Sequence, residues 1–336
     1  MCERSYFLNY VLGLPGKSGL AANKGNVVHK ALEVLALSKI EQQKGLKSYE
    51  IDVDGLGRID HKFCSSIDDI VAASLSYYMQ QTPNLKWTKR DQDDCYRWTY
   101  KVIEFQKGRL NPQNLNVVDC EPFFDVEIPD SWAAYSFNIG NNKIQGQLRL
   151  KGSIDLITQV NKDTYHLIDW KTGKRKDWAT DEVKTIEKLR NDPQLRIYFY
   201  AARKMYPHIK NFILTIFFIN DGGPFTFAFD ETDVVKTEVM LENRFKKIKA
   251  TTMPKANISW KCDKFCAYSA PYNETGVSIC SHFGNEIKTY GIDYVTNKHA
   301  KDKTFSKYSE GGGSKDKEAK NVEKSEHLSE QEKDVW

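Results

Sequence analysis

The chain of 336 residues lacks any apolar stretch near the ~18 residues that a membrane-spanning helix needs. Its longest apolar stretch, residues 212–219, has only the length of a β-strand, and the mean hydropathy is −0.59. The first ten residues also lack the basic start and apolar segment of a secretory signal. The sequence therefore predicts neither a membrane protein nor a secreted one.

Cysteine is scarce, with seven residues, and the number is odd. Together with the missing export signal, this argues against a framework of disulfides and favours a cytoplasmic location. A strong charge excess is missing too, because Lys and Arg number 49 against 45 for Asp and Glu. The net charge of +4 permits an anionic partner without requiring one.

Internal repeats and a nucleotide-hydrolysis motif are also missing. Residues 13–18 are similar to a phosphate-binding loop, but Val11 stands where that loop has its first glycine, and Pro15 lies inside it. Any motor that works with this chain would therefore be a separate protein.

What is present suffices for a core, since 40% of the residues are apolar. Apolar periodicity predicts helices over 25–40, 66–81, 91–108, 181–206 (with a break near Asp192-Pro193) and 231–249. It predicts strands over 115–128, 147–159 (broken at Gly152), 164–170, 211–219 and 224–229. This order predicts an α/β (α+β) fold with a central mixed sheet flanked by helices.

We expect one domain over residues 1–308, in which residues 46–115 form a helical insertion and residues 258–283 form a cysteine segment that closes onto Cys2. From residue 309 the chain has three glycines and then charges with almost no apolar residues. Residues 309–336 are therefore predicted to be a disordered tail, which could bind a protein partner. A short helix that orders on such a partner is the alternative.

Two carboxylates, Asp155 and Asp169, each lie between apolar residues on the two strands of a predicted hairpin. A carboxylate buried in this way is costly unless it is paired or binds a cation, so two of them indicate a shared cation. Lys171 emerges on the same strand face as Asp169, where it could orient water and stabilise charge on a phosphate. A buried salt bridge among the three is the alternative. Gly152 and Gly173, which would let another part of the chain come close, favour the site.

Four motifs occur in order along the predicted helix, strand, strand and helix: Gly25-x-x-x-His29, Gly152-x-x-Asp155, Asp169-x-Lys171-Thr172-Gly173 and Gln194-x-x-x-Tyr198. In this order they resemble the PD-(D/E)XK nuclease superfamily with its restriction-endonuclease-like core, and specifically the RecB-type nuclease domain. The resemblance covers residues 2–285.

The resemblance implies a divalent metal bound by His29, Asp155 and Asp169, with the Trp170 carbonyl as a further ligand, and it makes Lys171 the catalytic lysine. The oxygen ligands suit Mg²⁺, whereas the imidazole suits Mn²⁺ better. Without the resemblance, His29 would be read as an ordinary core or surface histidine.

Further residues near these motifs have expected roles in binding or support. The resemblance implies that Gln194 and Tyr198, one helical turn apart, contact the DNA backbone or steady the site. Glu121 lies where the family often carries a glutamate, and we expect it to support the structure, although solvation at a strand edge explains it equally well. Three basic residues follow Lys171 closely and suit contacts with phosphate, or form a solvated loop: Lys174, Arg175 and Lys176.

Cys262, Cys266 and Cys280 lie in one short segment and could chelate a metal with Cys2 as the fourth ligand. From the residues alone, Zn²⁺ fits these ligands as well as an iron–sulfur cluster does. His282 could replace Cys2 as a ligand. The alternative to any metal site is three buried or free thiols. AddB-type and CRISPR-associated RecB-like nucleases resemble the chain here, which implies a [4Fe–4S] cluster. The intervals of three and thirteen residues depart from the family's usual C-x-x-C.

The resemblance thus implies a Mg²⁺- or Mn²⁺-dependent DNA exonuclease that hydrolyses phosphodiester bonds, with a metal-activated water, in single strands or at duplex ends. Its context would be phage or bacterial recombination, repair or replication, in the cytoplasm of a bacterial or phage-infected cell. A non-catalytic DNA-binding or assembly subunit is one alternative, which the intact Asp-x-Lys set argues against. A CRISPR spacer-processing nuclease is the other.

Overall fold

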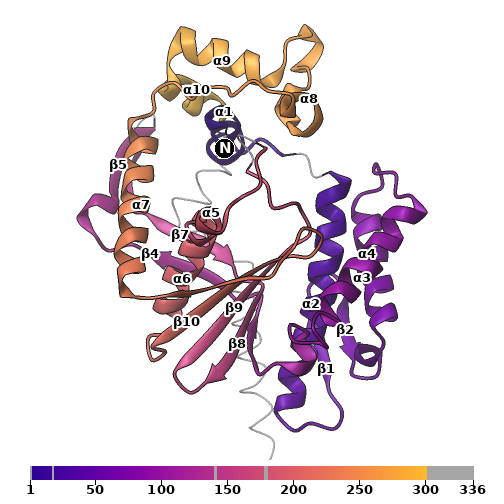
Figure 1. Ribbon diagram of the computed structural model, residues 1–336. Coiled ribbons are helices and arrows are strands. Elements are labelled where there is room, and N and C mark those ends of the chain that lie inside the picture. The colour runs from indigo at the N-terminus through magenta and orange to yellow at the C-terminus, as the bar shows by residue number, and fades with distance from the viewer. Residues whose placement is uncertain (1, 17–18, 140–141, 178–180, 301–336) are drawn as a thin grey trace, which may run out of the picture. The chain divides into compact units, whose positions relative to one another are not determined.

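The computed structural model describes residues 2–16, 19–139, 142–177 and 181–300 (Figure 1). The chain divides into two compact units. The first, here called the sheet unit, comprises Lys17–Ile128 and Arg149–Lys249. The second, the cysteine unit, comprises Met1–Gly16, Pro129–Leu148 and the chain from Ala250 onward. The predicted tail at 309–336 lies outside the described residues.

A five-stranded mixed sheet lies in the sheet unit, with the strand order β11-β10-β9-β8-β3. Its strands are β3 (Val117–Cys120), β8 (Leu156–Asn161), β9 (Thr164–Lys171), β10 (Asn211–Phe218) and β11 (Phe225–Phe229). Strands β9 and β10 are parallel, and the other neighbours are antiparallel. The predicted α/β class with a central mixed sheet is confirmed.

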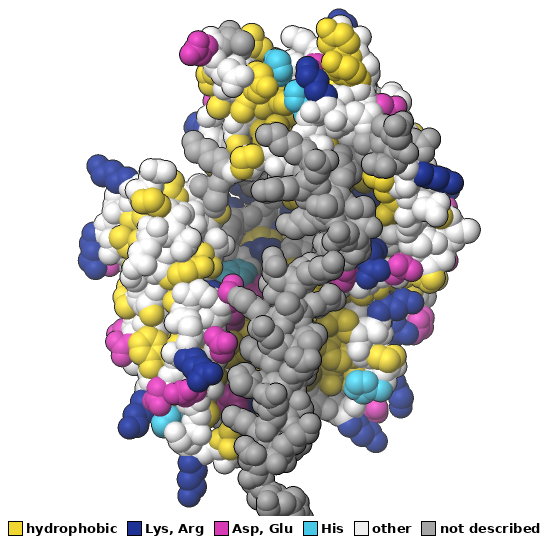
Figure 2. All heavy atoms as spheres, turned by 180° about the vertical axis from the view of Figure 1, so that it is seen from behind, with side chains coloured by type: hydrophobic (Ala, Val, Ile, Leu, Met, Phe, Trp, Pro, Cys, Tyr) yellow, Lys and Arg dark blue, Asp and Glu magenta, His cyan; other side chains and the backbone are white. Residues whose placement is uncertain are grey.

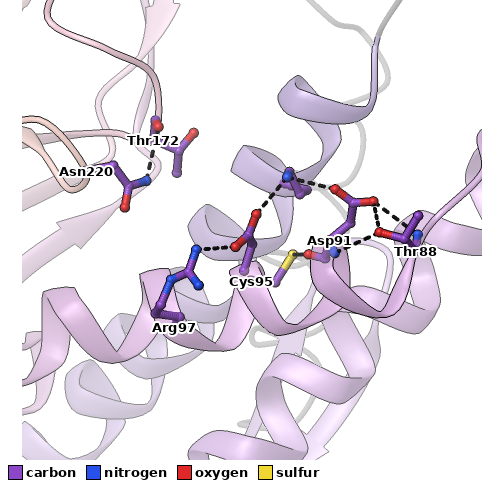
Figure 3. Close-up of polar contacts among 8 residues, drawn as sticks. Thr88, Asp91, Cys95, Arg97, Thr172 and Asn220 are labelled. Carbon is purple, nitrogen blue, oxygen red and sulfur yellow. Dashed lines mark hydrogen bonds and ion pairs between the residues drawn. The ribbon is translucent and has the colours of Figure 1, made fainter.

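The helix α2 (Leu20–Gln43) packs against β3 and against the helices α3 (Ile67–Gln81) and α4 (Lys89–Ile103). Apolar residues occur on most of its surface, so it is a buried central helix rather than an amphipathic one. Lys24 Nζ lies 2.9 Å from a carboxylate oxygen of Asp91 and 2.9 Å from one of Asp94, which fastens α2 to α4 (Figure 3).

The predicted helical insertion also contains a hairpin that we did not predict, formed by β1 (Glu50–Val53) and β2 (Gly57–Asp60). Its buried residues Ile51 and Val53 alternate with exposed ones, as strand residues do. This signal was present in the sequence, but it spans only four residues.

The helix α6 (Pro193–Met205) packs against β10 and β4, and Phe199 contacts both Phe212 and Phe229. The side chain of Asp192 accepts a hydrogen bond from the backbone N–H of Gln194 and so caps the helix, while Pro193 occupies its first position. These two residues separate α6 from α5 (Ile186–Arg190), at the break that the sequence predicted. The helix α7 (Glu231–Ala250) follows β11.

The strand predicted over 147–159 is two strands in the structure. The first, β7 (Arg149–Ser153), pairs with β4 (Phe123–Glu127) outside the central sheet, and β8 belongs to that sheet. The break therefore falls at Ile154-Asp155 and not at Gly152, as we had expected. Gly152 instead lies opposite Phe124, whose ring Cζ is 2.7 Å from the place that a β-carbon would occupy.

We expect Gly152→Ala to lower the free energy of unfolding by about 1–3 kcal/mol, because the ring of Phe124 is buried and must shift. Gly173→Ala is the matched control, because an added β-carbon there meets nothing within 4 Å. Our prediction that another part of the chain comes close to Gly173 is therefore wrong. Urea unfolding of both variants measures the difference. Equal stability of the two would contradict this packing.

The cysteine unit joins the two ends of the described chain. It contains α1 (Glu3–Tyr6), the π-helical turn η1 (Phe7–Val11), the hairpin β5 (Ala134–Ile139) and β6 (Asn142–Gln147), α8 (Lys261–Phe265), α9 (Ile279–Tyr290) and α10 (Ile292–His299). Buried Arg4 donates hydrogen bonds to the carbonyls of Pro254 (2.9 Å) and Cys280 (3.0 Å). Arg4 thus ties α1 to the C-terminal segment, and Figure 1 shows the indigo α1 beside the orange helices. No helix among the described residues has both the length and the apolar character to cross a bilayer.

Candidate metal and catalytic site

The hairpin of β8 and β9 brings the two predicted aspartates together. Leu156 pairs with Ile168, so Asp155, which directly precedes β8, lies opposite Asp169. Both side chains are buried, with 7% and 1% of their surface exposed. Asp155 Oδ2 accepts a hydrogen bond from the backbone N–H of Trp170 at 2.7 Å.

Lys171 lies beside this pair, as its spacing predicted. Its Nζ is 2.7 Å from Asp169 Oδ1, and both side chains point to one face of β9. Trp170, between them in sequence, points to the opposite face and joins the core around α2. Asp169 and Lys171 therefore lie on the face of β9 opposite to the one from which Trp170 enters this core.

Helix α2 brings His29 to the same place. Its Nδ1 lies 3.5 Å from Asp155 Oδ1, and its ring meets Trp170 edge-on at 6.3 Å between centroids. One turn earlier, a β-carbon on Gly25 would lie 2.8 Å from Thr172 Oγ1. Glycine at this position therefore lets α2 approach the end of β9 closely.

Glu121 completes the cluster, although we had expected it only to support the structure. It follows β3 with a φ of +50°, a left-handed conformation that is uncommon outside glycine. Its backbone N–H donates to the Asp155 carbonyl (3.2 Å), and its side chain accepts from Ser153 Oγ (2.8 Å). His29, Glu121 and Asp155 each offer a ligand atom within 4.8 Å of the others. The sequence signal for Glu121 was its match to a position where the family often carries a glutamate.

Burial and neighbouring charges shift the pKa values of the site in different directions. Burial would raise the pKa of Asp155, but His29 and Lys171 lower it. Burial, with the charge of Asp155, raises the pKa of Glu121 to about 7. Burial also raises the pKa of Asp169, against the attraction of Lys171. Burial would lower the pKa of His29, but Asp155, Glu121 and Asp169 together raise it to about 9. Such crowding of buried carboxylates is relieved when a cation binds among them.

The residues present fit a divalent cation. Asp169 Oδ2 is buried and has no hydrogen-bond partner among the described residues, which is costly for a carboxylate oxygen that has lost its water. The donors at the site are carboxylate oxygens and one imidazole nitrogen, the set that Mg²⁺ and Mn²⁺ accept. Asp169, Asp155, Glu121 and His29 are therefore the candidate ligands.

We expect the metal-free protein to lose stability as the pH rises from about 5 to 9. Glu121 and His29 both have folded-state pKa values above their ordinary ones, so the native state holds more protons than the unfolded state across this range. For Glu121 the loss falls between about pH 5 and 7 and amounts to a few kcal/mol at most. Urea midpoints of the wild type and Glu121→Gln in EDTA measure it. Identical pH slopes between pH 5 and 7 would contradict the raised pKa.

The turn after Lys171 is fixed by a neighbouring loop. Asn220 Nδ2 donates a hydrogen bond to the Thr172 carbonyl at 3.3 Å (Figure 3). Lys101, from α4, in turn donates to Asn220 Oδ1 at 3.0 Å. The helical insertion therefore helps to hold the end of β9 that carries the lysine.

The basic residues predicted to contact DNA differ in their surroundings. Lys174 is exposed, whereas Lys176 lies 3.0 Å from Asp181. The guanidinium of Arg175 lies over the ring of Phe225, 4.7 Å from its centroid. In the space-filling view, basic and acidic side chains are interspersed and form no single basic patch (Figure 2).

Gln194 and Tyr198 contact each other across one turn of α6, with Gln194 Nε2 donating to the Tyr198 hydroxyl at 2.7 Å. Tyr198 is buried and meets Phe124 edge-on at 6.1 Å between ring centroids. Phe124, on β4, also packs on Gly152 of β7. Through this ring, α6 packs against the β4–β7 pair.

The four predicted cluster cysteines are half-buried in the cysteine unit. Backbone N–H groups point at two of the sulfurs, from Asn257 to Cys2 (3.4 Å) and from Ser259 to Cys262 (3.5 Å). Burial raises the pKa of Cys280, Arg4 opposes this, and charge on the other three thiols raises the pKa further. Among the described residues, no cysteine belongs to a set of three ligand atoms within 4.8 Å of one another. His282 stacks on Tyr272, with 3.9 Å between the ring centroids.

Comparison with known proteins identifies the family. A model described as the PD-(D/E)XK nuclease superfamily matches residues 1–270. No curated protein matches the chain. One similar solved structure is a "Putative exonuclease" from Eubacterium rectale, which is 11% identical in sequence. The match covers 62% of this chain and 74% of the other chain, with a TM-score of 0.36. Another is SSO0001, which is 14% identical in sequence. This match covers 44% of this chain and 56% of the other chain, with a TM-score of 0.22.

Proposed function

The chain belongs to the PD-(D/E)XK nuclease superfamily, and within it we propose a Mg²⁺- or Mn²⁺-dependent DNA exonuclease of the RecB type. The observation that carries this proposal is the set of close ligand atoms offered by His29, Glu121 and Asp155. Buried Asp169 lies opposite Asp155 and is paired with Lys171. A scaffold protein has no need to bury carboxylates at this cost and to keep a lysine beside them. We therefore favour an enzyme over a non-catalytic subunit.

The chain's own groups have distinct tasks in this proposal. Asp155, Asp169, Glu121 and His29 hold the cation, which when bound supplies Lewis-acid chemistry and an activated water. Lys171 Nζ, kept charged and oriented by Asp169, stabilises the negative charge that develops on the phosphate. Gln194 and Tyr198 steady this face, and Lys174 contacts the backbone of the substrate. End-labelled DNA incubated in EDTA and then in Mg²⁺ or Mn²⁺ tests the proposal.

We also propose a [4Fe–4S] cluster on Cys2, Cys262, Cys266 and Cys280. Zinc with four thiolates, at about 2.3 Å each, needs sulfurs about 3.8 Å apart. No three of the described thiols lie within 4.8 Å of one another, as they would in such a set. N–H groups that point at sulfur are a further feature that suits an iron–sulfur centre.

Protein purified without oxygen should be brown, with broad absorbance near ~400 nm and about four irons per chain. Cys280→Ser should lose the colour, whereas Cys64→Ala, which removes a buried thiol of the sheet unit, should keep it. Iron and zinc analysis of the same samples checks the result. A colourless protein with one zinc per chain would overturn the cluster.

A further inference from the structure

An exposed aromatic pair flanks the thiols of the cysteine unit. Trp260 and Phe265 lie at the two ends of α8, with 5.8 Å between ring centroids and 70° between ring planes. Their side chains are 52% and 56% exposed. Of the tryptophans that the structure describes, Trp260 alone is exposed to this degree. Two large rings therefore lie next to each other at the surface of this unit.

Two positive charges lie close to the ring of Trp260. Nζ of Lys261 lies 5.5 Å from the centroid of Trp260, and Nζ of Lys264 lies 5.8 Å from it. Asp263 is the single acidic residue between positions 258 and 266. An apolar protein partner would have to desolvate both ammonium groups, whereas a nucleic-acid strand offers bases for the rings and phosphates for the lysines.

The pair stands on the segment that carries two of the proposed cluster cysteines. Cys262 lies within α8 and Cys266 follows it directly, and Cys262 Sγ accepts a hydrogen bond from the backbone N–H of Ser259, next to Trp260. A metal centre on these thiols would fix α8 at two points. Rings held in this way lose little freedom on binding, which strengthens the binding of bases.

We infer that Trp260 and Phe265 form a stacking platform for single-stranded DNA, with Lys261 and Lys264 contacting the phosphates. This inference rests on the proposed nuclease function and names a second place at which the chain holds its substrate. Because bases inside a duplex are already stacked, the platform distinguishes single strands from blunt duplexes.

The test is fluorescence anisotropy with a labelled oligothymidylate, using the full chain in EDTA so that no cleavage occurs. The double variant Trp260→Leu/Phe265→Leu keeps the apolar volume and removes the ring faces. We expect it to bind the single strand about tenfold or more weakly, and a blunt duplex nearly as well as the wild type does. Trp260→Phe keeps a ring and should retain most of the affinity. Lys261→Gln/Lys264→Gln should lower the salt dependence of binding.

The matched control is Tyr290→Leu/Tyr294→Leu, which removes another exposed aromatic pair of the same unit, with ring centroids 4.8 Å apart. A lysine also lies over this pair, but Lys298 is 2.6 Å from Glu286, so its charge is already compensated. We expect this control to bind like the wild type. An equal loss in both double variants would overturn the inference.

Thermal unfolding and metal content of each variant show whether the cysteine unit is intact. Unchanged affinity of Trp260→Leu/Phe265→Leu would overturn the platform and assign the patch to a protein partner. If the wild type cuts DNA while that variant binds normally, the inference fails and the proposed function stands. If the wild type neither cuts nor binds DNA, the proposed function fails as well.

Discussion

Lys171→Ala is expected to reduce DNA cleavage by about 10²–10⁴-fold, because in the proposed mechanism its ammonium group stabilises the charge on the scissile phosphate. The affinity for DNA should change only a few-fold. The ammonium group is paired with the buried carboxylate of Asp169, so it adds little to the positive charge that the protein surface presents to DNA. Single-turnover cleavage and anisotropy on the same preparations separate the two effects.

Lys151→Ala is the matched control for this variant. Lys151 has the same side-chain exposure as Lys171, 31%, and lies 3.0 Å from Asp125. It is on β7, which pairs with β4 and is not a strand of the central sheet. Its removal should leave cleavage unchanged. Full activity of Lys171→Ala, or an equal loss in both variants, would remove Lys171 from the chemistry.

Glu121→Gln is expected to weaken Mn²⁺ binding by about 10–100-fold and to reduce cleavage at least as much. The amide keeps the shape of the side chain and its contact with Ser153, but it removes the charge that a divalent cation needs. Calorimetric titration with Mn²⁺, together with the cleavage assay, measures both effects.

The control is Glu127→Gln, in which the replaced carboxylate is exposed at the end of β4 and pairs with Arg149 at 2.9 Å. Both its metal binding and its activity should match the wild type. Wild-type Mn²⁺ affinity in Glu121→Gln would show that Glu121 only supports the backbone, which was our expectation from the sequence.

The central part of the site could be predicted because it depends on local patterns. Asp155 and Asp169 interrupt apolar strands, and a spacing of two residues puts Lys171 on the face of Asp169. The position of His29 followed only from the resemblance to the family, since nothing in the sequence of α2 shows what the helix will approach.

What the sequence could not predict depends on tertiary structure. The side chain of Glu121 enters the cluster because its backbone takes a left-handed conformation, and no local propensity favours that for glutamate. Arg4 binds the carbonyls of Pro254 and Cys280, which lie more than 200 residues away in sequence, and no local pattern marks this arginine for that contact. Likewise, the break between β7 and β8 follows from pairing with two different strands, β4 and β9.

The most direct test of the account is the cleavage of end-labelled single-stranded and duplex DNA by the purified full chain, first in EDTA and then with Mg²⁺ or Mn²⁺ restored. We predict no cleavage in EDTA, stepwise loss of nucleotides from an end once the cation is added, and no recovery in Lys171→Ala. Cleavage that persists in EDTA, or an inert wild type with either cation, would contradict a cation held by Asp155, Asp169, Glu121 and His29 as the basis of function.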